Sequence, residues 1–180
     1  MKILIPVLFL AVGCSTSGSS IGEEILNAEN FNRKIAIEDS VRLWEYQPKI
    51  EMVDEVSKSG TTIIFTDMCL EKNVPKKFCA HFLKDPGMMG ACFFVRNPPV
   101  ILIRETSFNA MGLELQLKTL AHEIGHCLGH IEHSENPSDI MYSYPTWNES
   151  EKTEISESEK SKLWNGIGKG STVKFYLLRN

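Results

Sequence analysis

The strongest constraint on this chain is a pair of histidines four positions apart, His122 and His126, with Glu123 directly after the first. On an α-helix, residues at this spacing lie on one face with roughly 6 Å of rise between them, so both imidazoles can reach one metal ion. Glu123 then points to the side of that ion, where a carboxylate can take a proton from metal-bound water. The spacing therefore predicts a zinc site with hydrolytic chemistry on a helix.

The surrounding residues support a helix and predict where it ends. Asn109 is a suitable cap for its beginning. Apolar side chains recur at helical spacing on a face other than that of the two histidines: Leu113, Leu117, Leu120, Ile124 and Cys127 or Leu128. Gly129 can adopt a left-handed backbone, so we expect the helix to end there and the chain to turn back toward the metal.

The third metal ligand is ambiguous from the residues alone. If the helix continued, His130 would lie roughly 12 Å along its axis from His122, too far to share an ion that is coordinated at about 2 Å. Glu132 and His133 remain as candidates. Imidazole is the commonest metal ligand, which favours His133.

Composition indicates one ordinary globular domain. The chain has 180 residues, 42% of them hydrophobic and 23% charged, with a formal net charge of -4. Binding to nucleic acid needs clustered basic side chains that displace counterions, and this chain offers no such excess. We therefore expect no nucleic-acid partner, and we expect a monomer.

The beginning of the chain has the features of an export signal. Lys2 precedes an apolar run over 3–12 that is too short to span a bilayer. The run ends in Ala-Val-Gly-Cys, which resembles a bacterial lipobox and implies cleavage before Cys14, lipidation of Cys14 and anchoring to a membrane. Residues 1–13 are then a signal peptide, 14–30 a flexible tether rich in Ser and Gly, and the domain lies outside the cytoplasm in the cell envelope, at the outer membrane or the surface. An ordinary cleaved signal followed by an unmodified cysteine is the alternative.

Export also affects how the other cysteines are interpreted. Cys69, Cys79, Cys92 and Cys127 are an even number in a non-reducing compartment, and four cysteines allow three pairings. One of them joins Cys69 to Cys79 and Cys92 to Cys127, which would tie a strand to the motif helix. Alternatively, Cys127 is a buried small apolar side chain.

The remaining elements follow from periodicity and turn residues. His81 falls in a segment without periodicity, where we expect a surface residue rather than a ligand. Ser156 and Glu159 have the spacing of a capping box. The pattern predicts helices over 33–46 and 156–167, strands over 50–56, 61–66, 91–95, 100–104 and 172–178, and a long loop over 67–87.

The motif resembles that of the metzincin zinc peptidases, and within them the matrixins. It reads His122-Glu123-x-x-His126-x-x-Gly129, followed by a histidine and then Met141. The usual third histidine comes three residues after the glycine, where this chain has Glu132, but the spacing from His133 to Met141 matches. The resemblance therefore implies His122, His126 and His133 as zinc ligands and Met141 of the Met-turn as an apolar floor beneath them.

The resemblance also implies a fold and a binding cleft. The fold would be α+β, a zincin catalytic domain over 31–180 in which a mixed twisted sheet accompanies the active-site helix and a C-terminal helix. An extended peptide would pair with the strand that contains Ala91, Cys92 and Phe93, near Tyr144. The tail over 172–178 has no obvious counterpart in the family. Loops that hold calcium or a second zinc are not evident, so we expect the catalytic Zn²⁺ alone.

The expected activity is that of a zinc-dependent endopeptidase of extracytoplasmic proteins or peptides, with a zinc-activated water and Glu123 as general base. A surface binding or adhesion lipoprotein with a non-catalytic zinc site is one alternative. Glu123 argues against it, because a structural site prefers four protein ligands and needs no base. A zinc amidohydrolase acting on cell-wall peptides is the other, and the matrixin-like order of elements argues against it.

Overall fold

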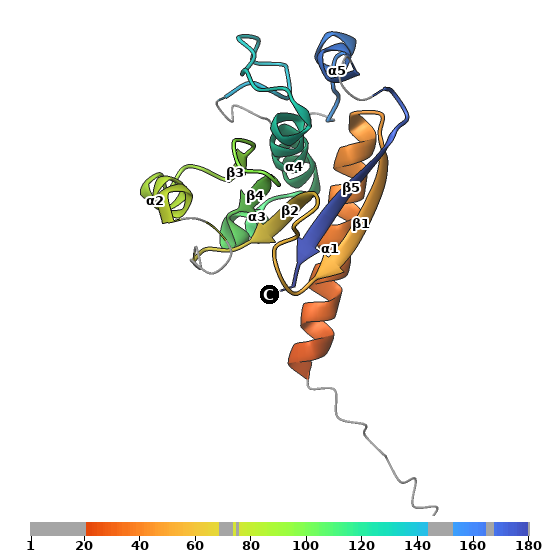
Figure 1. The fold of residues 1–180 in the computed structure, drawn as a ribbon. Helices are drawn as coiled ribbons and strands as arrows, with labels where there is room; N and C mark the ends of the chain where they lie inside the picture. Colours follow the sequence, from red (N-terminus) through yellow and green to blue (C-terminus); the bar gives the residue numbers. More distant parts are fainter. Residues whose placement is uncertain (1–20, 69–73, 75, 144–152, 165–167, 180) are drawn as a thin grey trace, which may run out of the picture.

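The computed structural model of this chain describes residues 21–68, 74, 76–143, 153–164 and 168–179. Its helices and strands follow one another as Figure 1 shows. In chain order they are α1 (Ile21–Leu43), β1 (Gln47–Val53), β2 (Thr61–Phe65), α2 (Lys76–Lys84), β3 (Gly90–Phe93), β4 (Val100–Ile103), α3 (Glu105–Ala110), α4 (Leu113–Leu128), α5 (Glu157–Trp164) and β5 (Thr172–Leu178).

The five strands form one sheet in the order β1-β5-β2-β4-β3. Strands β1, β5, β2 and β4 run parallel, whereas β3 pairs antiparallel with β4 at the edge. The mixed sheet expected from the sequence is therefore confirmed. The predicted tail strand is also confirmed, and as β5 it is an interior strand that pairs with β1 on one side and β2 on the other (Figure 1).

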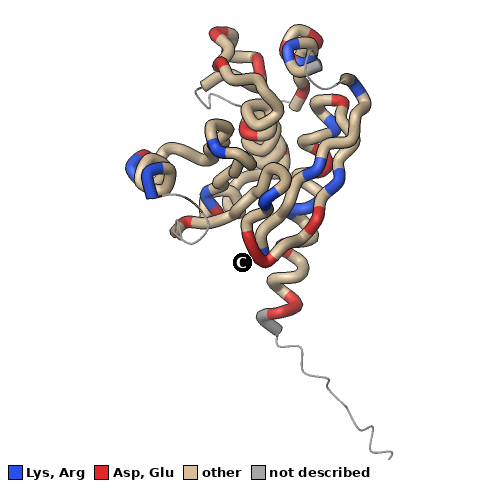
Figure 2. Tube along the Cα trace, in the orientation of Figure 1, with Lys and Arg blue, Asp and Glu red and all other residues tan. Residues whose placement is uncertain are grey.

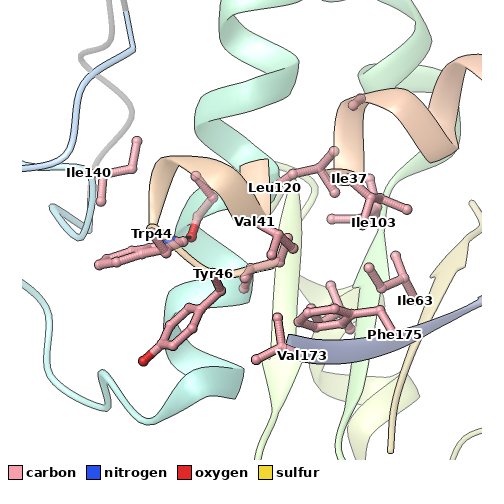
Figure 3. Packing of buried hydrophobic residues seen from close by; sticks show 14 of the residues in the cluster. Ile37, Val41, Trp44, Tyr46, Ile63, Ile103, Leu120, Ile140, Val173 and Phe175 are labelled. Atoms are coloured by element: carbon pink, nitrogen blue, oxygen red, sulfur yellow. Dashed lines mark hydrogen bonds between the residues drawn. The ribbon is translucent and has the colours of Figure 1, made fainter. Parts of the chain in front are cut away.

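Side chains that alternate along the strands build a core on each face of the sheet. On one face, Ile63 and Phe65 of β2 belong to the cluster that contains Ile37 of α1, Trp44 just after α1 and Leu120 of α4 (Figure 3). On the other face, Ile64 of β2 belongs to a smaller cluster. The other buried members of that cluster are Val74, Cys79, Phe82, Phe93, Val100, Leu102 and Leu178.

The expected tether over 14–30 is wrong for residues 21–30, because helix α1 begins at Ile21. The segment lacks proline and has Glu23 and Glu24 in its first turn, where acidic side chains interact favourably with the positive end of the helix dipole. Glu29 also lies within 3.7 Å of Arg33, one turn later. Residues 14–20, including Cys14, lie outside the described residues.

Two other local predictions are wrong. The loop predicted over 67–87 contains helix α2, whose side chains Cys79 and Phe82 are buried in the smaller cluster on the sheet, with Phe78 packed beside them. The amphipathic pattern covers only nine residues between segments with Asp, Asn, Pro and Gly, and the sequence prediction overlooked it. Asn109 does not cap α4, because it belongs to the separate helix α3, and Gly112 is the N-cap residue of α4.

Basic and acidic residues are interspersed along the described chain (Figure 2). Many form opposite-charge neighbours, such as Lys174 and Glu51 at 2.7 Å on adjacent strands. Within the described part of the chain, no helix is long and apolar enough to cross a membrane.

Candidate metal centre

Helix α4 packs closely against two neighbouring side chains at Gly125. A Cβ atom at this position would lie 2.6 Å from Cζ2 of Trp44 and 2.7 Å from Sδ of Met141. The indole Nε1 of Trp44 donates a hydrogen bond to the Ala121 carbonyl at 2.8 Å, which fixes the ring against the helix. Glycine is therefore the residue that lets this turn of α4 approach both neighbours.

The helix ends as the sequence predicts. Gly129 has a φ of 117°, in the left-handed region, and its N–H bonds the carbonyls of Gly125 and His126. The N–H of His130 bonds the Gly125 carbonyl at 2.9 Å. These contacts satisfy the last carbonyls of the helix and turn the chain back over its own end.

The imidazoles of His122, His126 and His133 converge near this turn. The ring nitrogens of His122, His126 and His133 lie within 4.8 Å of one another. Nε2 of His126 lies 3.1 Å from Nε2 of His122 and 3.2 Å from Nε2 of His133. Two imidazoles at about 2.05 Å from a tetrahedral zinc would place their nitrogens about 3.3 Å apart. The spacing therefore fits one zinc ion, and Glu132 does not belong to this group.

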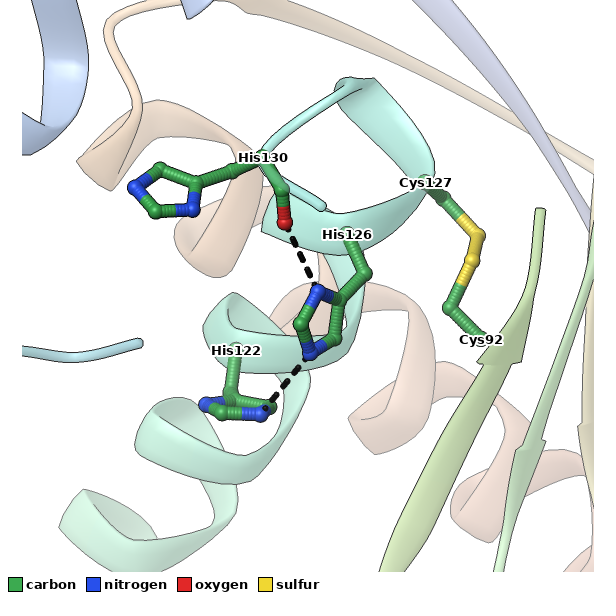
Figure 4. The surroundings of a disulfide bond; sticks show 5 residues. All are labelled: Cys92, His122, His126, Cys127 and His130. Atoms are coloured by element: carbon green, nitrogen blue, oxygen red, sulfur yellow. Dashed lines mark hydrogen bonds between the residues drawn. A yellow bond between two sulfur atoms is a disulfide. The ribbon is translucent and has the colours of Figure 1, made fainter. Parts of the chain in front are cut away.

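The hydrogen bonds of the Nδ1 atoms explain why Nε2 of His122 and Nε2 of His126 can bind a metal. Nδ1 of His122 donates to the Ile140 carbonyl at 2.7 Å. Nδ1 of His126 donates to the His130 carbonyl, also at 2.7 Å (Figure 4). Carbonyls only accept, so in a neutral ring the proton lies on Nδ1 and Nε2 presents a lone pair. Two such lone pairs face each other with no proton between them, which is an arrangement that a cation satisfies.

Burial keeps these rings neutral. Together with a smaller contribution from the neighbouring imidazoles, it lowers the pKa of His122 to about 3 and that of His126 to about 4. Removal from water disfavours the charged form of a histidine. Because only the unprotonated nitrogen binds a metal, both residues are ready to coordinate at neutral pH.

Glu123 lies between α4 and the edge strand β3. Its side chain is buried, which raises its pKa to about 8, while a backbone hydrogen bond from Cys92 acts in the opposite direction. The contact with the strand is tight, because a Cβ atom on Gly90 would lie 2.7 Å from Cγ of Glu123. The ionised form of this carboxylate, beside three imidazoles and bonded by a strand amide, can accept and return a proton, and a cation held by the imidazoles would favour that form.

Met141 packs against α4, where its Sδ would lie 2.7 Å from a Cβ atom at Gly125, and its backbone is held by the distant helix α5. Its N–H donates to the Glu159 carboxylate at 3.0 Å, and Glu159 is 1% exposed. The same carboxylate accepts from the N–H of Ser156 at 3.2 Å and from its hydroxyl at 3.1 Å. The predicted capping box is confirmed, but sequence reasoning missed its link to Met141, because nothing in the local pattern indicates that contact.

Sequence reasoning also missed the role of His130. The residue is 4% exposed, and its ring packs against Trp44 with centroids 6.3 Å apart. Its Nδ1 donates to the Glu132 carbonyl at 2.8 Å, while its own carbonyl accepts from His126. His130 thus folds the turn so that His133 reaches the other imidazoles. The one-residue excess between Gly129 and His133 was the available signal.

A cavity of about 880 Å³ opens in front of the three histidines and Glu123. Ala91, Cys92 and Phe93 line it, as expected from the sequence, whereas Tyr144 lies outside the described residues. His81, expected on the surface in a loop, is exposed on helix α2 and lines the same cavity. Much of the remaining lining is apolar: Phe78, Met88, Met89, Phe94, Val95 and Ile131.

A disulfide joins the two walls of this site. Of the pairings left open by the sequence, the structure forms the bond between Cys92 on β3 and Cys127 on α4 (Figure 4). Cys127 is therefore not a free buried thiol. Cys69 lies outside the described residues, so the predicted bond between Cys69 and Cys79 stays a prediction.

A comparison with protein families agrees with this arrangement. A family model described as Matrixin matches residues 28–165, more than half of the chain. The match runs from within α1 to the end of α5 and includes the three histidines, Glu123 and Met141. Strand β5, which lies between β1 and β2 in the sheet, comes after the matched residues.

Proposed function

Because this chain belongs to the matrixin family of zinc metallopeptidases, we propose that it is an endopeptidase that cleaves proteins or peptides outside the cytoplasm. In this proposal His122, His126 and His133 hold the zinc and Glu123 is the general base. The observation that carries the proposal is the convergence of three imidazole nitrogens beside a buried carboxylate, with Nε2 atoms 3.1 and 3.2 Å apart.

The chemistry divides between the metal and Glu123. Bound zinc supplies a Lewis acid that lowers the pKa of water and stabilises the negative charge developing on a peptide carbonyl oxygen. Glu123 accepts the proton of the attacking water and returns it to the leaving amine. The Cys92 N–H keeps the carboxylate oriented toward the cavity during both transfers.

Strand β3 is the proposed binding edge for the substrate. It pairs on one side with β4 and forms the end of the sheet, next to the cavity. An extended peptide can add to such an edge through backbone hydrogen bonds, with alternate side chains pointing into pockets. Pairing along a strand needs no free chain terminus, which favours internal cleavage. The apolar lining favours substrates with apolar side chains near the cleaved bond.

The proposed location rests on two features of the chain. The segment ending at Cys14 resembles a lipoprotein signal, so we propose a membrane-anchored enzyme at the outer membrane or surface. The disulfide between Cys92 and Cys127 supports an oxidising compartment, because such bonds are rare where thiols are kept reduced.

The first experiment separates binding from catalysis. Purified full-length protein is loaded with zinc and assayed on unfolded casein, alongside Glu123→Ala and His126→Ala. We expect one zinc per chain in the parent and in Glu123→Ala, cleavage in the parent alone, and loss of zinc from His126→Ala. Cleavage by Glu123→Ala at the parent rate would show that the base is assigned wrongly. A parent that binds zinc but cleaves nothing would favour a binding lipoprotein.

A second experiment addresses the third ligand with two adjacent substitutions. His133→Ala removes a ring nitrogen that lies 3.2 Å from that of His126, whereas Glu132→Ala removes a side chain outside the group. Zinc affinity measured by competition with a chromophoric chelator should fall at least a hundredfold in His133→Ala and less than threefold in Glu132→Ala. The reverse order would move the ligand to residue 132.

A further inference from the structure

The disulfide between Cys92 and Cys127 joins the strand and the helix that flank Glu123. We propose that this bond positions Glu123 for catalysis, so that its reduction lowers turnover while the metal stays bound. The inference rests on the proposed function, and it assigns Cys92 and Cys127 as positioning residues rather than catalytic ones.

Among the described residues, strand β3 meets the helix through packing contacts, such as Gly90 against Glu123, and through one covalent bond, the disulfide. Its four residues pair with β4 on one side, and it forms the edge of the sheet on the other. The pairing with β4 sets the position of the strand within the sheet, but not its separation from α4. The disulfide sets that separation directly, with the Cα atoms of Cys92 and Cys127 5.9 Å apart.

The bond lies one helical turn from Glu123. Cys127 is four residues after Glu123 on α4, and residues at this spacing share a helix face. Cys92 therefore contributes twice to the same contact, since its sulfur bonds the helix and its N–H bonds the Glu123 carboxylate. Gly90, two residues earlier, brings the strand so near that a Cβ atom would lie 2.7 Å from Cγ of Glu123.

Such a contact is sensitive to small displacements. An N–H···O hydrogen bond has a donor–acceptor distance of about 2.7 to 3.2 Å and weakens steeply when its angle falls below about 120°. Misplacing a catalytic group by about 1 Å can cost on the order of a hundredfold in rate. Without the disulfide, β3 can move relative to α4 by that amount while it stays paired with β4.

The metal ligands do not depend on this bond. All three histidines come from α4 and the turn that follows it, and none lies on β3. The carbonyls that hold the outer nitrogens of His122 and His126 belong to Ile140 and His130, which also lie outside β3. Loss of the disulfide should therefore affect Glu123 and leave the metal in place.

The test uses the zinc-loaded full chain and the double variant Cys92→Ala/Cys127→Ala. Both are assayed with and without a trialkylphosphine, which does not bring a competing thiol to the zinc. The phosphine transfers two electrons to the disulfide and becomes the phosphine oxide by taking oxygen from water, while both sulfurs become thiols. The double variant treated with phosphine controls for reduction elsewhere in the chain.

We expect kcat of the double variant to be at least tenfold below that of the parent, with KM changed less than threefold and one zinc per chain retained. Phosphine should lower kcat of the parent to that of the double variant and leave kcat of the double variant unchanged. Reoxidation should restore kcat of the parent. A lower melting temperature with unchanged kcat well below that temperature would show that the bond only adds stability and would overturn the proposal. Loss of zinc from the double variant would overturn it as well.

A measurement without substrate separates this inference from the peptidase assignment. Hydrogen exchange at the Cys92 amide, which donates to Glu123, should be at least tenfold faster in the double variant, with β2 and β4 unchanged. Equal exchange would refute the coupling even in an active enzyme. A parent that lacks peptidase activity would refute the proposed function, and the exchange rates would still decide whether the disulfide holds the strand to Glu123.

Discussion

Replacing Gly125 by alanine tests the packing that places the motif helix. The added Cβ would lie 2.6 Å from Cζ2 of Trp44 and 2.7 Å from Sδ of Met141, both closer than real Cβ contacts. Neither neighbour can yield easily. The Trp44 ring is fully buried and bonded to the Ala121 carbonyl, and the backbone of Met141 is held by Glu159.

Two opposing terms set the size of the effect. Inserting a methyl group into a packed core costs about 1 to 3 kcal/mol. Alanine gains about 1 kcal/mol over glycine inside a helix. Because the added Cβ meets two buried neighbours at once, we take the upper part of the packing cost, about 2 to 3 kcal/mol, and expect Gly125→Ala to lower the free energy of unfolding by about 1 to 2 kcal/mol. In a domain of this size the melting temperature falls by about 2 to 4 °C per kcal/mol, which gives about 2 to 8 °C.

Thermal and urea unfolding of the metal-free protein measure this effect without a contribution from zinc. Gly168→Ala is the matched control, because a Cβ there meets only the Ser171 hydroxyl oxygen at 3.8 Å. The control should change stability by less than about 0.5 kcal/mol, as exposed substitutions usually do. If Gly125→Ala were as stable as the parent or more stable, helix propensity would dominate and the close approach would be refuted.

Three further substitutions or treatments give clear outcomes. Glu159→Ala leaves the buried N–H of Met141 without its acceptor, so urea unfolding should show a free energy of unfolding lower by about 2 to 3 kcal/mol. Glu159→Gln should lose less than half of that. Equal losses in the two variants would contradict this role of Glu159. Removing residues 172–180 deletes β5, the interior strand that joins β1 to β2, so the truncated chain should show no cooperative unfolding. A cooperative transition would contradict the topology. Chelation should lower the melting temperature of the zinc-loaded parent, because a ligand present at about 1,000 times its Kd adds about 4 kcal/mol. The same treatment should leave His126→Ala unchanged, and an equal shift in that variant would place the zinc elsewhere.

The local features of the site were predictable because they follow from short-range geometry. The four-residue spacing of His122 and His126 sets them on one helix face, and Gly129 ends that helix with the expected left-handed residue. The strands over 61–65 and 172–178 were visible as short runs rich in apolar and β-branched residues. Each of these depends on neighbours within a few positions, which is the range that a sequence pattern can report.

The features that were missed depend on contacts between distant segments. Nothing in the composition of 172–178 indicates that this strand lies between β1 and β2 rather than at an edge. Helix α2 is only nine residues long and is stabilised where Phe78, Cys79 and Phe82 pack on the sheet, so its sequence pattern was too short to stand out from the flanking loops. The position of His133 depends on how the ring of His130 folds against Trp44, which is separated from it by most of the domain's sequence.

Zinc K-edge X-ray absorption of the zinc-loaded full chain tests the central claim most directly. Three imidazole nitrogens of His122, His126 and His133 should appear at about 2.0 Å, with one further light atom and no sulfur. In His133→Ala the number of imidazoles should fall to two. A spectrum of the parent with fewer than three imidazoles, or with a sulfur ligand, would contradict the proposed metal centre.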